Sequence, residues 1–210
     1  MVSLSRPALF AAVLTTAWLP GVGFAVAQTQ QDWASCLTGD LRTPDVPIDG
    51  CTAVIQTGRQ VLQNLATAYN NRGVAYRVKG KYAEAINDFN EAIRLVPDYG
   101  TAFNNRGVAY RNMGDMDRAV ADYDQAIRLK PDYAAAFYNR GLALGDKHQY
   151  EKAIADFTTV LKIDPHDPTV LYRRGIAYLS TGDVAAGNAD LTEARTIKPN
   201  IAEDIARSGP

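Results

Sequence analysis

The chain contains few residues of the kinds that carry out catalysis. It has two histidines, His148 and His166, and two cysteines, Cys36 and Cys51. Neither histidine stands in an H-E-x-x-H motif, and neither has a carboxylate or cysteine spaced to complete a metal site or a catalytic triad. A catalytic histidine needs an orienting partner, so we expect both to be exposed turn residues. The sequence predicts no catalytic residue, no metal site, no cofactor and no enzymatic activity.

Charged residues, by contrast, recur with a regular spacing. Each of four arginines is followed sixteen residues later by an aspartate: Arg72 and Asp88, Arg106 and Asp122, Arg140 and Asp156, and Arg174 and Asp190. A row of arginines could bind an acidic ligand, whereas arginine–aspartate pairs would be structural ion pairs. We favour the structural interpretation, because a buried arginine without its carboxylate would be costly. Such pairs require that the two residues lie on facing antiparallel helices.

An internal repeat of constant length supplies those helices. Glycines recur at a single fixed interval with no insertion: Gly73, Gly107, Gly141 and Gly175. The same interval separates small residues (Ala85, Ala119, Ala153 and Gly187) and prolines (Pro97, Pro131, Pro165 and Pro199). Within each unit, apolar residues at helical spacing on both sides of a turn predict two helices, and the proline ends the second. Each unit is therefore predicted to be a helical hairpin.

This pattern resembles the tetratricopeptide repeat family, whose 34-residue unit carries aromatic residues, glycine, small residues and proline at these offsets. The resemblance, to an exported bacterial member, implies an all-α fold: a right-handed α-solenoid of four helix-turn-helix repeats behind an N-terminal helical cap. The four units are residues 66–99, 100–133, 134–167 and 168–201, with a C-terminal tail at 202–210.

Two units depart from the repeat pattern. The third has His148 where the turn between its helices favours glycine, and histidine tolerates a left-handed backbone better than most residues. The fourth has Gly187 inside its second helix and Asn188 in place of an apolar residue, so we expect it to be the least tightly packed. Few apolar residues follow it. The last hairpin should therefore either fray or pair with a second subunit, giving a homodimer through the C-terminal repeat.

The N-terminal segment, residues 1–27, has the pattern of a secretory signal peptide. Arg6 is the only charged residue before an uncharged stretch that extends from Pro7 to Ala27 and ends in small residues. We expect cleavage after Ala27 rather than an uncleaved membrane anchor, because Pro20 and the two glycines that follow it should break a helix in this stretch.

The composition supports an exported, globular chain and excludes several classes. Of 210 residues, 47% are hydrophobic and 21% are charged, and the formal net charge is −1. The chain therefore lacks the excess of positive charge that is typical of proteins that bind nucleic acid or anionic membranes. We therefore expect a secreted, periplasmic protein with no nucleic-acid partner and no stable membrane insertion after signal cleavage.

The two cysteines predict a structural disulfide bond. In an oxidising compartment an even pair is most simply a disulfide, and Cys36 and Cys51 lack the C-x-x-C spacing of an oxidoreductase. The bond would close a loop of about 15 residues and contribute about 3 kcal/mol of stability. Trp33 and Cys36 suit a first short helix and residues 48–55 a second. We interpret residues 28–65 as an eroded repeat that caps the array.

In the family, the first helices of the repeats line a concave groove that holds a peptide or a partner helix. Carried over by position, the groove residues are Asn70, Asn71, Arg77, Asn104, Asn105, Arg111, Tyr138, Asn139, Tyr172 and Arg173. A row of asparagines could satisfy the backbone of an extended peptide, although asparagine is also common here without that role. The clamp by which cytosolic members hold acidic C-termini is not reproduced, since only Asn105 agrees with it. The arginines leave a preference for acidic segments open.

These observations predict a protein–protein interaction scaffold or adaptor that binds a partner peptide or helix in its concave groove. The alternative is a self-associating structural protein of the cell envelope, whose groove or C-terminal face receives another copy.

Overall fold

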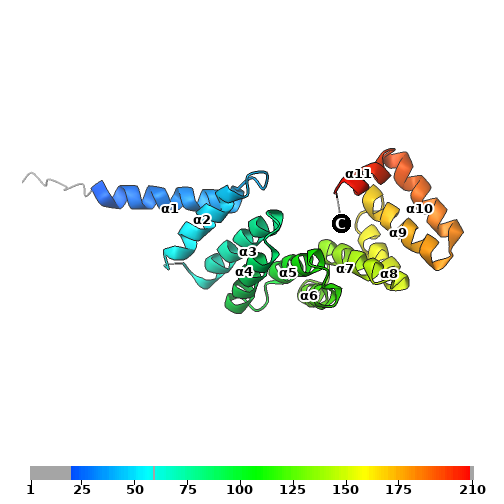
Figure 1. Cartoon of the computed structure of the whole chain (residues 1–210), viewed down its shortest axis with the longest axis horizontal. Coiled ribbons are helices and arrows are strands. Elements are labelled where there is room, and N and C mark those ends of the chain that lie inside the picture. Colours follow the sequence, from blue (N-terminus) through cyan, green and yellow to red (C-terminus); the bar gives the residue numbers. More distant parts are fainter. Residues whose placement is uncertain (1–19, 59, 209–210) are drawn as a thin grey trace, which may run out of the picture.

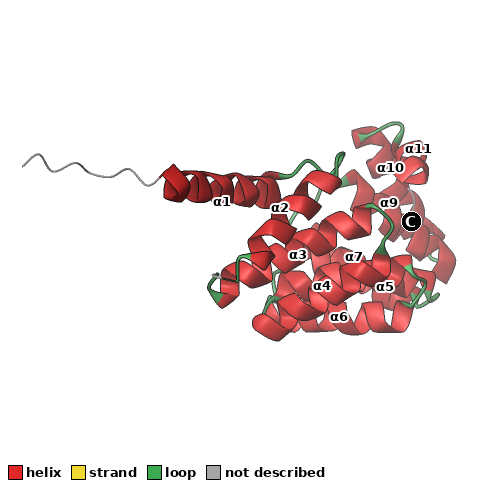
Figure 2. Cartoon of the chain, turned by 60° about the vertical axis from the view of Figure 1, so that its left-hand side comes forward, coloured by secondary structure: helices red, strands yellow, loops and turns green. Residues whose placement is uncertain are grey.

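The computed structural model describes residues 20–58 and 60–208, with residues 20–28 and 208 described by their backbone alone. Most of the predicted signal peptide, residues 1–27, lies outside the described residues. The described residues form helices joined by short loops and no strands (Figure 2). The helices are α1 (Pro20–Thr38), α2 (Asp45–Gln56), α3 (Leu62–Val78), α4 (Tyr82–Leu95), α5 (Gly100–Asn112), α6 (Met116–Leu129), α7 (Ala134–Asp146), α8 (Tyr150–Leu161), α9 (Pro168–Thr181), α10 (Val184–Ile197) and α11 (Ile201–Ser208).

Consecutive helices pair into hairpins, and the hairpins stack into an arc (Figure 1). Helices α3, α5, α7 and α9 lie along the inner curve, and α4, α6, α8 and α10 lie along the outer curve. The inner helices contact one another as well as their own partners. The described chain is therefore the predicted all-α solenoid, and its inner curve is formed by the first helix of each repeat.

Close approach of the two helices explains the recurring glycine. A Cβ added to this glycine in the first three repeats would lie 2.7 Å from a ring carbon of the facing aromatic residue: Gly73 and Phe89, Gly107 and Tyr123, and Gly141 and Phe157. No real side chain tolerates that distance, so the aromatic ring fits only because the glycine has no Cβ. Both Phe89 and Tyr123 are fully buried.

Gly107→Ala is expected to lower the free energy of unfolding by about 1–3 kcal/mol, because the added methyl group overpacks the ring of Tyr123. Gly145 in α7 provides a matched control, since an added Cβ there meets nothing within 4 Å. Gly145→Ala should raise stability by up to about 1 kcal/mol, as alanine favours a helix more than glycine does. Urea unfolding followed by circular dichroism measures both, and equal effects would contradict the explanation.

The turns between paired helices require a left-handed backbone. Gly80, Gly114 and Gly182 occupy three of these turns with φ of 75°, 81° and 88°, and His148 occupies the third repeat's turn with φ of 57°. This confirms the conformation expected for His148. Histidine incurs a steric cost here that glycine does not.

The fourth hairpin is closely packed, which differs from our expectation. A Cβ added to Gly187 would lie 2.9 Å from the carbonyl oxygen of Gly175 and 2.7 Å from Cδ2 of Leu179. The backbones of α9 and α10 therefore approach each other directly, and Gly187 permits that approach. Asn188 is exposed, so an apolar residue at that position would add little to the core.

Helix α11 covers the end of the array. Ile201 is 1% exposed and packs in the largest apolar cluster with Val170, Leu171 and Ala194. The last hairpin is thus covered, because Ile201 packs into its core, and the open apolar surface that we expected at this end is absent from the described residues.

The N-terminal hairpin is tied together by a disulfide between Cys36 and Cys51, whose Cα atoms are 4.6 Å apart. Both cysteines are buried with Val54 of α2 and Ala68 of α3, so the hairpin shares a core with the first repeat. This geometry agrees with a disulfide-stapled cap.

One detail of the N-terminal prediction is wrong. Helix α1, which is described from Pro20 onward, continues through Gly21 and Gly23, which we expected to break it. Glycine weakens a helix without ending it. Among the described residues, no helix combines the length and the apolar character needed to cross a membrane.

Candidate interaction surface on the inner curve

The four arginine–aspartate pairs form inside each repeat. In every pair the arginine donates from Nε and from a terminal nitrogen to the two carboxylate oxygens, over 2.6–2.9 Å. The aspartate side chains are at most 10% exposed. These geometries match the structural interpretation, in which each arginine joins the two helices of its own hairpin.

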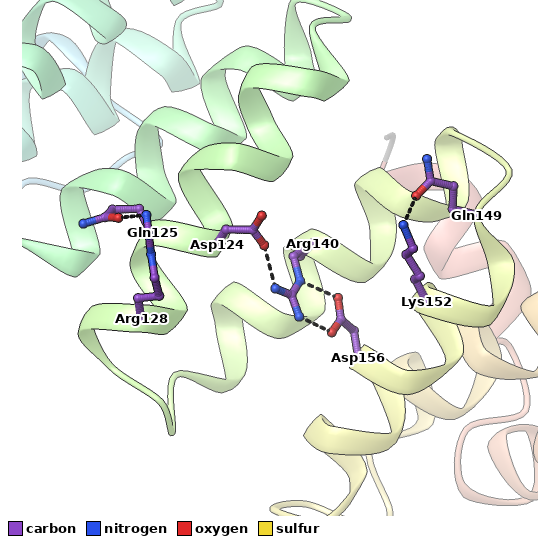
Figure 3. Close-up of polar contacts among 7 residues, drawn as sticks. All are labelled: Asp124, Gln125, Arg128, Arg140, Gln149, Lys152 and Asp156. Carbon is purple, nitrogen blue, oxygen red and sulfur yellow. Dashed lines mark hydrogen bonds and ion pairs between the residues drawn. The ribbon is translucent and has the colours of Figure 1, made fainter.

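Each of these arginines has a further partner that the sequence analysis missed. The remaining terminal nitrogen donates to a side chain on the second helix of the preceding hairpin: Arg72 to Thr52, Arg106 to Asn90, Arg140 to Asp124, and Arg174 to Thr158. Figure 3 shows Arg140 between Asp124 of α6 and Asp156 of α8. One side chain therefore holds three helices together. Each of these arginines thus makes three hydrogen bonds within the fold, which favours the structural interpretation over a row that binds an acidic ligand.

The asparagines predicted to line the groove bind one another. Side-chain amides donate in one direction along the inner helices, and we call this series the asparagine chain: Asn139 to Asn104 over 3.0 Å, Asn104 to Asn105 over 3.5 Å, Asn105 to Asn70 over 3.0 Å, Asn70 to Asn71 over 3.2 Å, and Asn71 to the carbonyl oxygen of Cys36 over 3.2 Å. The chain extends from α7 through α5 and α3 to α1.

This arrangement corrects the predicted role of two asparagines. Asn70 and Asn104 are each 5% exposed, so they do not present their amides to a peptide. Adjacent inner helices lie close enough for these amides to reach the next repeat, and a buried amide is stabilised by such a partner. The Asn-Asn dipeptide, which recurs at the same place in consecutive repeats, was the available signal. Asn71, Asn105 and Asn139 are partly exposed, but each already donates within the asparagine chain.

The three arginines predicted in the groove differ in their surroundings. Arg111 in α5 donates from Nε to Asp146 at the end of α7, over 2.8 Å, so its charge is neutralised within the chain. Arg77 in α3 and Arg173 in α9 each have a buried Nε without a hydrogen-bond partner. Burial also lowers the pKa of Arg77, because no carboxylate compensates the loss of water around its guanidinium. The inner surface thus has two incompletely paired cations.

The remaining groove residues are aromatic and lie toward the C-terminal end. Tyr138 and Tyr172 are partly buried and pack against the largest apolar cluster. Tyr138 also lines an open hollow of about 330 Å³ between α7 and α9, together with Ala135, Thr169 and Val170. This hollow offers room for a side chain of a bound segment.

The histidines lie apart from these features. Both are exposed; Nδ1 of His148 lies 2.7 Å from the hydroxyl of Tyr150, and Nδ1 of His166 lies 3.0 Å from a carboxylate oxygen of Glu193. Within residues 20–58 and 60–208, no three histidine, cysteine or acidic side chains are grouped as metal ligands.

An arc of stacked helix pairs with polar and apolar groups along its inner curve defines a helical-repeat scaffold. Sequence comparison identifies the kind of repeat. Residues 73–114 and 109–147 match the family described as TPR repeat, and residues 134–167 match the one described as tetratricopeptide repeat. Residues 73–167 of this chain therefore consist of tetratricopeptide repeats. No curated protein matches its sequence.

Solved structures of repeat proteins share the fold. A crystal structure of MamA aligns with a TM-score of 0.68 at 20% identity, over 85% of this chain and 93% of MamA. MamA from Desulfovibrio magneticus RS-1 aligns with a TM-score of 0.71 at 18% identity, over 84% and 96%. YrrB, described as a TPR protein with an unusual peptide-binding site, aligns with a TM-score of 0.63 at 21% identity, over 87% of each chain.

Proposed function

We propose that this protein is a non-catalytic scaffold that binds a peptide or helix of a partner protein along its inner curve. The observation that carries the proposal is the pair of incompletely satisfied arginines, Arg77 and Arg173, on the inner helices α3 and α9. Exposed apolar side chains lie on the same two helices, Val78 at 43% and Ile176 at 42%. A surface with free cations and exposed apolar groups favours a protein ligand.

The bonding between repeats suits this role. The arginine bridges and the asparagine chain connect each hairpin to the next, so the inner curve is held in shape before a partner arrives. A rigid surface loses little conformational entropy on binding, which favours affinity. The peptide-binding site named for YrrB, which has the same fold, is consistent with an interaction of this kind.

Photocrosslinking tests the proposal. A photoreactive amino acid at Tyr138 or Ile176, on the inner helices, should capture a partner protein in cells. The same residue placed at Asn87, which is exposed on the outer helix α4, serves as the control and should not. Crosslinks that arise only from Asn87 would overturn the proposal.

We also propose that the chain is exported to the periplasm. The N-terminal signal pattern and the disulfide geometry of Cys36 and Cys51 support this location. Cell fractionation and intact-mass measurement test it: the periplasmic protein should begin at Gln28. A cytoplasmic protein that retains the whole predicted signal segment would contradict the proposal.

Light scattering separates the scaffold from the alternative of a self-associating envelope protein. A scaffold should remain a monomer or a fixed dimer, whereas the alternative should form larger assemblies as concentration rises. Helix α11 packs Ile201 against the last hairpin and so covers the apolar surface that suggested a homodimer through the C-terminal repeat, which favours a monomer.

A further inference from the structure

Arg77 and Arg111 occupy the same place in consecutive repeats, and only one of them has an acidic partner. Nε of Arg111 donates to a carboxylate oxygen of Asp146 over 2.8 Å. Asp146 lies on α7, the next inner helix along the arc. The residue that stands in the place of Asp146 one repeat earlier is Asn112, a neutral amide. The repeats therefore serve as an internal comparison: Arg111 shows what an arginine at this place binds, and Arg77 lacks it.

Arg77 has a buried hydrogen-bond donor, Nε, for which the surrounding groups supply no acceptor. Among the described residues, the buried side-chain nitrogen and oxygen atoms without a hydrogen-bond partner are Nε of Arg77, the hydroxyl of Tyr123 and Nε of Arg173. Two of the three belong to one neighbourhood, since the charges of Arg77 and Arg111 both act on the Tyr123 hydroxyl. A buried donor without an acceptor is costly. The terminal nitrogens of Arg77 are not among these buried atoms, so they are the part of the guanidinium that an acceptor from outside can reach.

Tyr123 adds to the asymmetry between repeats. The equivalent residues are Phe89, Phe157 and Leu191, none of which has a hydroxyl group. Burial raises the pKa of Tyr123, so this hydroxyl stays protonated and is a neutral donor. Only in the second repeat, then, does the core residue beneath the inner surface bring a hydrogen-bonding group toward the two arginines.

We propose that Arg77 binds a carboxylate of an acidic peptide segment, as Arg111 binds the carboxylate of Asp146 within the chain. This inference rests on the proposed function and names the chemistry of its partner. A peptide suits the inner curve better than a small free anion does, because exposed apolar side chains such as Val78 and Ile176 and the hollow beside Tyr138 offer apolar contacts on the inner helices. Asp146 is itself 40% exposed and keeps Arg111 from acting as a second anchor.

Three substitutions test the assignment, two of which are reciprocal. Fluorescence anisotropy would measure binding of a labelled peptide of alternating glutamate and alanine, with the same peptide carrying glutamine as the neutral probe. Arg77→Gln should weaken binding of the acidic probe by about tenfold or more, as expected for a lost charge-assisted hydrogen bond. Asn112→Asp should weaken it similarly while raising the melting temperature, because the new carboxylate occupies Arg77. Asp146→Asn should strengthen binding, because it releases Arg111.

The outcomes separate this inference from the proposed function. If the acidic and neutral probes bind equally, or if Asn112→Asp leaves affinity unchanged, the anchor is wrong, although crosslinks from Tyr138 would still support a scaffold. Crosslinks only from Asn87 would instead overturn the scaffold itself. Inorganic phosphate that competes as well as the peptide would overturn the choice of a peptide. Circular dichroism melts of each variant establish that a loss of binding is not a loss of folding.

Discussion

Replacing Asp122 with alanine is expected to lower the free energy of unfolding by about 3–5 kcal/mol. The carboxylate of Asp122 receives two hydrogen bonds from Arg106, and the side chain is 9% exposed. Without it, the guanidinium of Arg106 stays largely buried with Asn90 as its neutral hydrogen-bond partner. An uncompensated buried charge is far more costly than the pair is favourable. Chemical denaturation and thermal melting, both followed by helical circular dichroism, measure the effect.

Asp124, two residues further along α6, is the matched control. It also accepts from an arginine, Arg140, but its side chain is 49% exposed and Arg140 keeps Asp156 as a second acidic partner. Asp124→Ala should therefore change stability by no more than about 1 kcal/mol. An unchanged melting temperature for Asp122→Ala, or equal losses in both variants, would show that these pairs do not stabilise the fold.

Removal of the disulfide is expected to have the second largest effect. Replacing both Cys36 and Cys51 with serine should cost about 3 kcal/mol, since the bond restricts a loop in the unfolded chain. The loss should be local, because each hairpin of a repeat array contacts only its neighbours. Amide hydrogen exchange is expected to accelerate in α1 and α2, and to a smaller degree in α3, where Asn71 donates to the carbonyl of Cys36.

Hydrogen exchange in α7–α10 provides the internal control for this experiment. These helices lie at the other end of the arc and share no apolar cluster with the cysteines. Their exchange should be the same in the oxidised protein, in the reduced protein and in the double serine variant. Uniform acceleration along the whole array would mean that the solenoid unfolds as one unit, contrary to this prediction.

The architecture was predictable because it depends on periodicity. Apolar residues at helical spacing, recurring in every unit, determine where hairpins form, and glycine facing an aromatic ring determines how closely their helices approach. The arginine–aspartate pairs were predictable for the same reason, since sixteen residues connect facing positions of one hairpin. All of these contacts lie within a single repeat.

Contacts between repeats were not predictable in the same way. They depend on how far one hairpin is translated and rotated relative to the next, and no spacing within a unit contains that information. The asparagine chain and the third partner of each arginine are contacts of this kind, as is the pair of Arg111 and Asp146. This explains why Asn104 was assigned to an open groove, and why Arg77 and Arg111 seemed equivalent.

The arginine bridges also bear on how such a chain can grow. In the second, third and fourth repeats, each bridge uses one residue sixteen positions before the arginine and one sixteen positions after it, as Arg106 and Arg140 show. Duplication of a whole unit in the gene would therefore introduce the new arginine together with both of its acceptors. An insertion of another length between Arg106 and Asp122, for example, would separate the cation from its carboxylate. The ion pairs would thus favour changes in the number of repeats by whole repeats.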